Sequence, residues 1–175
     1  MKTWLQDVYF PSVSNESHLI VDALSQYCDF VNIGEAVPAV VNFELKRIPA
    51  GTTATTQPLD VGFFRSWKQF VRRVCDRSLM EGGVDMFQRD NVIKLQSLVH
   101  FQFSAPLYSD MIRYAWYKSG LVQIRPPTFK TPLQFCFPKE IHHCKQCTRF
   151  KFIKCSWYHA FLCYNHFFVQ YHICH

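Results

Sequence analysis

The chain has 175 residues, of which 19 are basic and 13 are acidic, for a formal net charge of +6. This length is enough for one domain, or for one small domain with an appendage. An uncharged apolar run of about 18 residues, the minimum for a membrane-spanning helix, does not occur, so we expect no membrane span.

The charges are distributed unevenly along the chain. Residues 1–44 contain six acidic residues and one basic residue, whereas residues 61–80 contain five basic residues and one acidic residue. The five basic residues are Arg65, Lys68, Arg72, Arg73 and Arg77. A basic helix beside an acidic half suits a nucleic-acid enzyme whose carboxylates hold metal, so these five are candidate nucleic-acid contacts. A solvated polar helix face explains the same charges equally well.

The first candidate catalytic residue follows a short apolar run. Residues 18–22 read His-Leu-Ile-Val-Asp, which predicts a buried strand of the parallel type with Asp22 at its carboxyl end. Sheets of α/β proteins bind their ligands at that end. The alternative is that Asp22 is an ordinary turn or helix-cap carboxylate.

The second candidate lies where a loop passes into a helix. An extended apolar run over residues 43–48 ends at Pro49-Ala50-Gly51, which predicts a strand and a turn. Pro58 then fixes the backbone just before Asp60. Apolar residues follow at helical spacing: Phe63, Phe64, Trp67, Phe70, Val71, Val74 and Cys75. A carboxylate at this junction suits metal binding, and a cap or first-turn charge is the alternative.

These two segments resemble those of one enzyme family. Residues 48–53 (Ile-Pro-Ala-Gly-Thr-Thr) and 57–62 (Gln-Pro-Leu-Asp-Val-Gly) resemble the segment carrying the last catalytic acid of DDE-superfamily endonucleases. These are the transposases of pogo, Tigger and mariner-like elements, and genes domesticated from them. Residues 19–22 resemble the strand that bears the second acid, and the 38-position step from Asp22 to Asp60 fits the family.

The resemblance implies a ribonuclease H-like fold in which three acids hold two Mg²⁺ ions for phosphoryl transfer. Asp22 and Asp60 are therefore candidate catalytic residues and Mg²⁺ ligands. The family's first acid lies on an earlier strand, whereas only 21 residues precede Asp22 here, and neither Asp7 nor Glu16 lies in a comparable strand. We expect the C-terminal part of a transposase, with a truncated ribonuclease H-like fragment, lost endonuclease activity, retained DNA binding and a nuclear location.

Two further helices are expected after the basic one. Residues 81–83 (Glu-Gly-Gly) break the chain, and a second helix is expected to begin at Asp90 or Asn91. Its inward residues are predicted to be Val92, Leu95, Leu98, Val99 and Phe103. A third helix is expected after Ser104-Ala105-Pro106, with a stop at Gly120.

From Phe135 onward the chain is rich in cysteine and histidine. Cys144 and Cys147 form a C-x-x-C chelate, and Cys163 and His166 follow at the same spacing. Thiolates combined with imidazoles favour Zn²⁺ over Mg²⁺ or Ca²⁺. The candidate zinc ligands are Cys144, Cys147, Cys155, Cys163, His166, His172 and Cys174, with His159 as a reserve ligand.

Many members of the resembled family end in a similar module, with a cysteine where this chain has Tyr158. One zinc site is therefore expected, and a second stays open. The alternative is a small aromatic core with inert buried cysteines, but so short a segment buries too little apolar surface to fold unaided. Cys28, Cys75 and Cys136 lie in apolar contexts and are expected in the core.

The sequence thus predicts an α+β protein in three parts. They are a partial ribonuclease H-like fragment (1–62), a helical region (63–132) and a zinc-binding tail (133–175). The expected function is DNA binding, with a protein partner for the tail as an addition. The alternative is a zinc-stabilised module that contacts protein rather than nucleic acid, and its binding would depend less on salt. Zinc removal is expected to unfold the tail while the helices persist.

Overall fold

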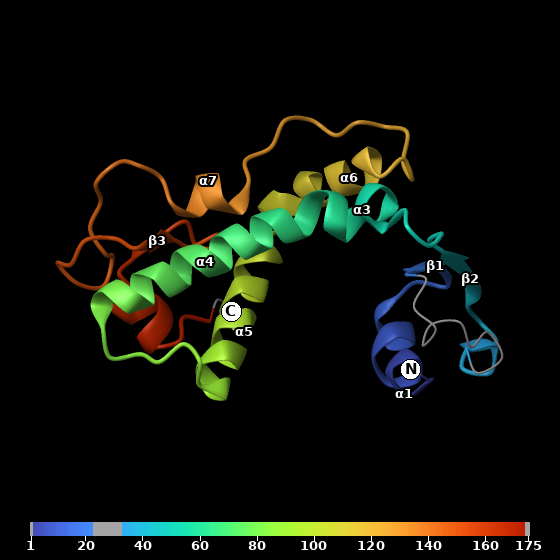
Figure 1. Ribbon diagram of the computed structural model, residues 1–175, viewed down its shortest axis with the longest axis horizontal. Helices are drawn as coiled ribbons and strands as arrows, with labels where there is room; N and C mark the ends of the chain where they lie inside the picture. Colours follow the sequence, from blue (N-terminus) through green and yellow to red (C-terminus); the bar gives the residue numbers. More distant parts are fainter. Residues whose placement is uncertain (1, 23–32, 174–175) are drawn as a thin grey trace. The chain divides into compact units, whose positions relative to one another are not determined.

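The structure is a computed structural model that describes residues 2–22 and 33–173 (Figure 1). It divides into two compact units, Met1–Gln57 and Pro58–His175. Each unit has its own cluster of buried apolar side chains. No helix in the described residues is long and apolar enough to cross a membrane.

The first unit opens with a continuous helical segment. It consists of α1 (Lys2–Trp4), the π-helical turn η1 (Leu5–Tyr9) and the 3₁₀ turn η2 (Phe10–Ser12). Leu5 and Phe10 from this segment form the core of the unit with Ile33 and Ala36. Pro11 stands inside η2, and the chain becomes extended at Val13.

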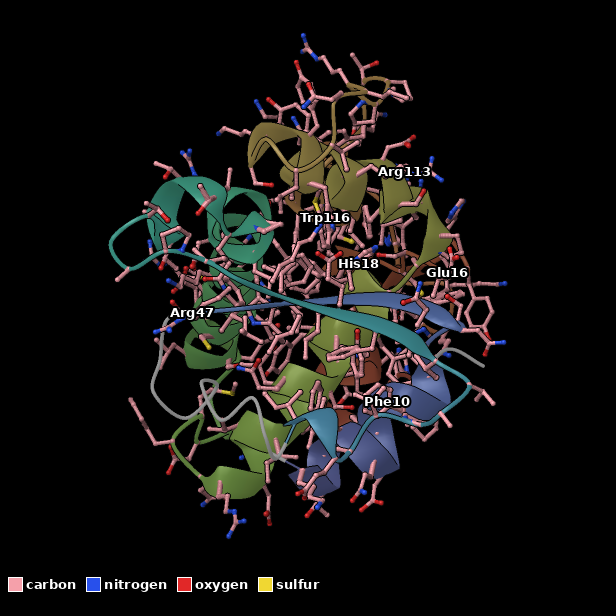
Figure 2. The ribbon with its side chains drawn as sticks, turned by 90° about the vertical axis from the view of Figure 1, so that its right-hand side faces the viewer. Phe10, Glu16, His18, Arg47, Arg113 and Trp116 are labelled. Atoms are coloured by element: carbon pink, nitrogen blue, oxygen red, sulfur yellow. The ribbon has the colours of Figure 1, made fainter. Side chains whose placement is uncertain are left out.

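Two parallel strands form the described sheet of this unit. The strands are β1 (Glu16–Val21) and β2 (Asn42–Arg47), paired in register from Glu16 opposite Asn42 to Val21 opposite Arg47. Figure 2 shows the two strands side by side, with Glu16 near one end of the pair and Arg47 near the other. The predicted parallel strand before Asp22 is therefore confirmed, but it is only partly buried, with Ser17 and Val21 as its buried residues. The described sheet of this unit has two strands, and the ribonuclease H-like fragment stays a prediction.

The second unit is organised around one long helix. After the short α3 (Thr53–Thr56), which closes the first unit, the π-helical turn η4 (Leu59–Phe63) leads directly into α4 (Phe64–Glu81). The helix buries Phe70, Val74 and Ser78 and ends at Gly82. The φ of +67° at Gly82 is a left-handed backbone that glycine adopts without strain. The predicted amphipathic helix and its stop are confirmed.

Two more helices follow, of which the first packs against α4 and the second against η4. They are α5 (Arg89–Phe103) and α6 (Ser109–Lys118), joined by the 3₁₀ turn η5 (Pro106–Tyr108). Four of the five predicted inward residues of α5 are buried, but Val92 is exposed because it lies in the first turn, beyond the reach of the core. Gly62 lies against α6, so close that a Cβ there would stand 2.7 Å from the Cβ of Ala115.

The cysteine-rich segment adds short elements to the same unit. These are α7 (Pro132–Cys136), β3 (Ile153–Lys154), β4 (Phe161–Leu162) and the π-helical turn η6 (Asn165–Val169), with β3 and β4 antiparallel. Phe152, Phe167 and Phe168 share one buried cluster with Phe70 of α4 and Leu98 of α5. The helical region and the tail, treated as two parts in the sequence, therefore fold around one core.

Candidate metal centre

Four cysteine and histidine side chains meet at one point of the second unit. Cys144 and Cys147 lie in the loop before β3, Cys163 directly follows β4, and His166 lies in η6. Their ligand atoms all lie within 4.8 Å of one another. The antiparallel β3–β4 pair brings the two chelates together, since the Lys145 amide donates a hydrogen bond to the Phe161 carbonyl at 2.8 Å.

The distances fit a tetrahedral zinc ion. The Cys147 and Cys163 sulfurs are 3.8 Å apart, and the Nδ1 of His166 lies 3.1, 3.6 and 3.3 Å from the sulfurs of Cys144, Cys147 and Cys163. A tetrahedron with Zn–S bonds of about 2.3 Å places its sulfurs just under 4 Å apart. A set of three thiolates and one imidazole leaves no open position, which is typical of structural rather than catalytic zinc.

Hydrogen bonds within the cluster favour the thiolate form of one of its cysteines. Burial raises the pKa of the Cys144 thiol, but hydrogen bonds from the backbone of Cys163 and Gln146, together with those from the side chains of His166 and Cys147, lower that pKa to about 6. Burial raises the pKa of Cys163. A metal ion binds the thiolate form, so its binding would displace the proton that Cys163 otherwise keeps.

The other predicted ligands lie outside this cluster or outside the described residues. Cys155 is fully buried, and the Nε2 of Gln102 approaches its sulfur at 3.9 Å. His172 packs against the Tyr158 ring, and His159 against the Phe135 ring. Cys174 lies outside the described residues. A role for Cys155, His172 and Cys174 in metal binding stays a prediction.

The remaining cysteines were expected in the core, and the structure describes two of them. Cys136 is fully buried, and its sulfur contacts the hydroxyls of Tyr108 and Ser156 at 3.3 and 3.2 Å. Burial raises the pKa of Cys136 to about 11, so this thiol stays protonated. Cys75 is half-buried against the same core, whereas Cys28 lies outside the described residues.

Buried hydrogen bonds attach the segment that carries the Cys/His cluster to the helices. Ser78 of α4 shares a hydrogen bond with the hydroxyl of Tyr164, the residue after Cys163. Gln102 of α5 accepts a 2.7 Å hydrogen bond from the Ser156 amide. Both Ser78 and Gln102 are buried polar residues, which the hydrophobic pattern of a sequence does not reveal because their partners are far along the chain.

The two candidate catalytic acids lie in different units. Asp22 directly follows β1, and the Thr53 hydroxyl donates a hydrogen bond to its Oδ1 at 3.3 Å. Asp60 is exposed in the first turn of η4, a position that also suits an ordinary first-turn carboxylate. Each acid thus has the local position that the sequence predicts, and joint Mg²⁺ binding stays a prediction.

The five basic residues of α4 are not equivalent. Arg65, Lys68, Arg72 and Arg73 are exposed along the helix. Arg77 is half-buried and pairs with Glu81 one turn later. Four of the five basic side chains are therefore available to an anionic partner, whereas Arg77 already forms an ion pair within the chain.

Part of the chain matches one known protein family. Residues 116–174 match the family described as Tc5 transposase C-terminal domain, a range that includes all four residues of the metal centre. The match supports a transposase-derived protein. Comparisons with curated proteins and with solved structures gave no match.

Proposed function

We propose that this chain is a DDE-type, transposon-derived polypeptide that binds DNA through the exposed face of α4. The observation that carries the proposal is the row of Arg65, Lys68 and Arg72 along one helix, because the i, i+3, i+7 spacing brings all three to one side. The transposase-type match supports a nucleic-acid partner. Without a base-reading element among these contacts, binding would be weak and independent of sequence.

The salt dependence of binding to duplex DNA tests this proposal. The variant Arg65→Gln, Lys68→Gln, Arg72→Gln should flatten the slope of log K against log salt by about 2.7, at about 0.9 for each phosphate that the variant no longer neutralises. The control Arg89→Gln, Lys118→Gln, Arg125→Gln removes the same charge from exposed positions outside α4. An equal slope in the two variants would refute the assignment to α4.

We also propose that the endonuclease activity of the resembled family is lost. Two carboxylates, Asp22 and Asp60, do not complete a two-metal site, and each 1.36 kcal/mol of lost transition-state stabilisation slows a reaction about tenfold. Plasmid DNA should therefore stay un-nicked with Mg²⁺ or Mn²⁺. Nicking by the unaltered chain that disappears in the double variant Asp22→Ala plus Asp60→Ala would show that a third metal ligand exists.

A nuclear location of the chain belongs to the same proposal. Imaging the tagged chain in cells tests it.

A second candidate function is a zinc-stabilised module that contacts protein. It is favoured by three apolar side chains around the end of α4, since Leu79, Met80 and Phe87 are 75%, 80% and 95% exposed. An apolar interface depends little on salt, whereas phosphate contacts weaken steeply as salt rises. If Leu79→Ser plus Met80→Ser left DNA binding unchanged but abolished a salt-insensitive protein interaction, the second function would hold.

A further inference from the structure

A groove of about 870 Å³ lies in the second unit, between α4, α7 and the β3–β4 pair. Figure 1 shows α7 beside α4, and β3 packs against α7. Five basic side chains line the groove, and we call them the groove cations: Arg72, Arg73, Lys130, Lys139 and Lys154. They come from three segments that are far apart in the chain, so no local sequence pattern indicates the groove.

Aromatic rings hold some of these cations in place. The Arg73 guanidinium lies 5.7 Å from the centre of the Phe137 ring, and the Lys154 ammonium lies 4.5 Å from that of Phe135. Lys154 is also 5.7 Å from the Phe161 ring, on which His142 stacks at 4.0 Å. These rings therefore already have partners, and their role is to order cations rather than to stack on bases.

The groove has a surplus of positive charge. Its other charged side chains are two carboxylates, Asp76 and Glu140, against the five groove cations. Among the residues that the structure describes, none of the groove cations forms an ion pair. Cations in excess over the neighbouring carboxylates attract a polyanion such as a nucleic acid, because the cations neutralise its phosphates and so release the counterions condensed on it.

We propose that the groove binds the phosphodiester backbone of a single nucleic-acid strand. A duplex is stiff, with a persistence length of about 50 nm, and it presents a broad convex surface, whereas one strand is narrow and can follow the groove. This inference rests on the proposed function, since α4 supplies Arg72 and Arg73, and it assigns the single strand to a surface other than Arg65 and Lys68. The occupied rings imply affinity without base preference, in contrast to sites that stack bases on aromatic side chains.

Two matched variants separate the two surfaces in the zinc-loaded full chain. The groove variant is Lys130→Gln plus Lys139→Gln, and the helix variant is Arg65→Gln plus Lys68→Gln. All four side chains are exposed, and each variant removes two positive charges. The probes are an oligothymidylate and an oligodeoxyadenylate of about 12 nucleotides and a duplex of equal length, with binding followed by fluorescence anisotropy at several salt concentrations.

The groove variant should bind both single strands about tenfold more weakly, with a salt slope reduced by about 1.4, at about 0.7 per phosphate. Its duplex affinity should stay within about twofold of the original. Unchanged single-strand affinity in the groove variant, or equal losses in both variants, would overturn the inference. A strong preference for one homopolymer would contradict phosphate-only binding. Unchanged duplex affinity in the helix variant would instead refute the proposed function, in which duplex DNA binds to the exposed face of α4.

Discussion

At the scale of single residues, the candidate metal centre consists of side chains that differ in burial. Cys144 and Cys163 are buried, whereas Cys147 and His166 are half-buried. Removal of a half-buried ligand tests metal binding with little disturbance of packing. A serine at position 147 keeps nearly the same volume but is a poor ligand for zinc, which prefers thiolate and imidazole.

The variant Cys147→Ser should therefore bind one zinc ion fewer per chain than the original protein. Native mass spectrometry of reduced, zinc-supplied protein measures this directly. The matched control is Cys75→Ser, a half-buried cysteine outside the cluster, which should retain the full zinc content. Retention of all zinc by Cys147→Ser would show that the four residues are not the ligands.

A second residue-scale prediction concerns the approach of η4 to α6. In Gly62→Ala the new Cβ would stand 2.7 Å from the Cβ of Ala115, closer than real side chains come, so one element must shift. We expect a decrease of about 1–3 kcal/mol in the free energy of unfolding. Chemical denaturation measures it. Gly62→Ala combined with Ala115→Gly should lose less than the sum of the single changes, and strict additivity would refute the contact.

At the scale of elements, α5 is tied to the cysteine-rich segment by one buried amide side chain. Gln102 is fully buried and accepts the hydrogen bond of the Ser156 amide. Gln102→Leu has a similar volume but leaves that amide without its acceptor, which costs about 1–3 kcal/mol. The control Gln96→Leu lies on the exposed side of the same helix. Equal unfolding free energies for the two variants would count against this role of Gln102.

The elements also show how far sequence reasoning reaches in this chain. Periodicity predicted α4, and the apolar run before Asp22 predicted β1, because both signals are local. The C-x-x-C and C-x-x-H spacings predicted which four residues form the cluster for the same reason. The exclusion of Cys155 and His172 from the cluster depends on how the β3–β4 pair folds back, and the groove cations meet only through tertiary packing. Residue spacing alone reveals neither the exclusion of these two residues nor the groove.

At the scale of the whole molecule, the shared core changes the expected response to metal removal. The sequence predicted that zinc removal unfolds the tail while the helices persist. Cys144 and Cys163 belong to the same buried cluster as Phe70 of α4 and Leu98 of α5. Structural zinc binding supplies about 10–16 kcal/mol in small modules, which is comparable to the total stability of about 5–15 kcal/mol of a domain. We therefore expect the helices of the second unit to lose stability together with the tail.

Amide hydrogen exchange with and without zinc tests this most directly, because it reports each element separately. The account predicts that a zinc chelator speeds exchange in α4 and α5 as well as in the β3–β4 pair, and that β1 and β2 of the first unit exchange as before. Cys147→Ser without chelator should reproduce the same pattern. Fast exchange confined to residues 135–173, with α4 and α5 still fully protected, would contradict a metal centre that stabilises the whole second unit.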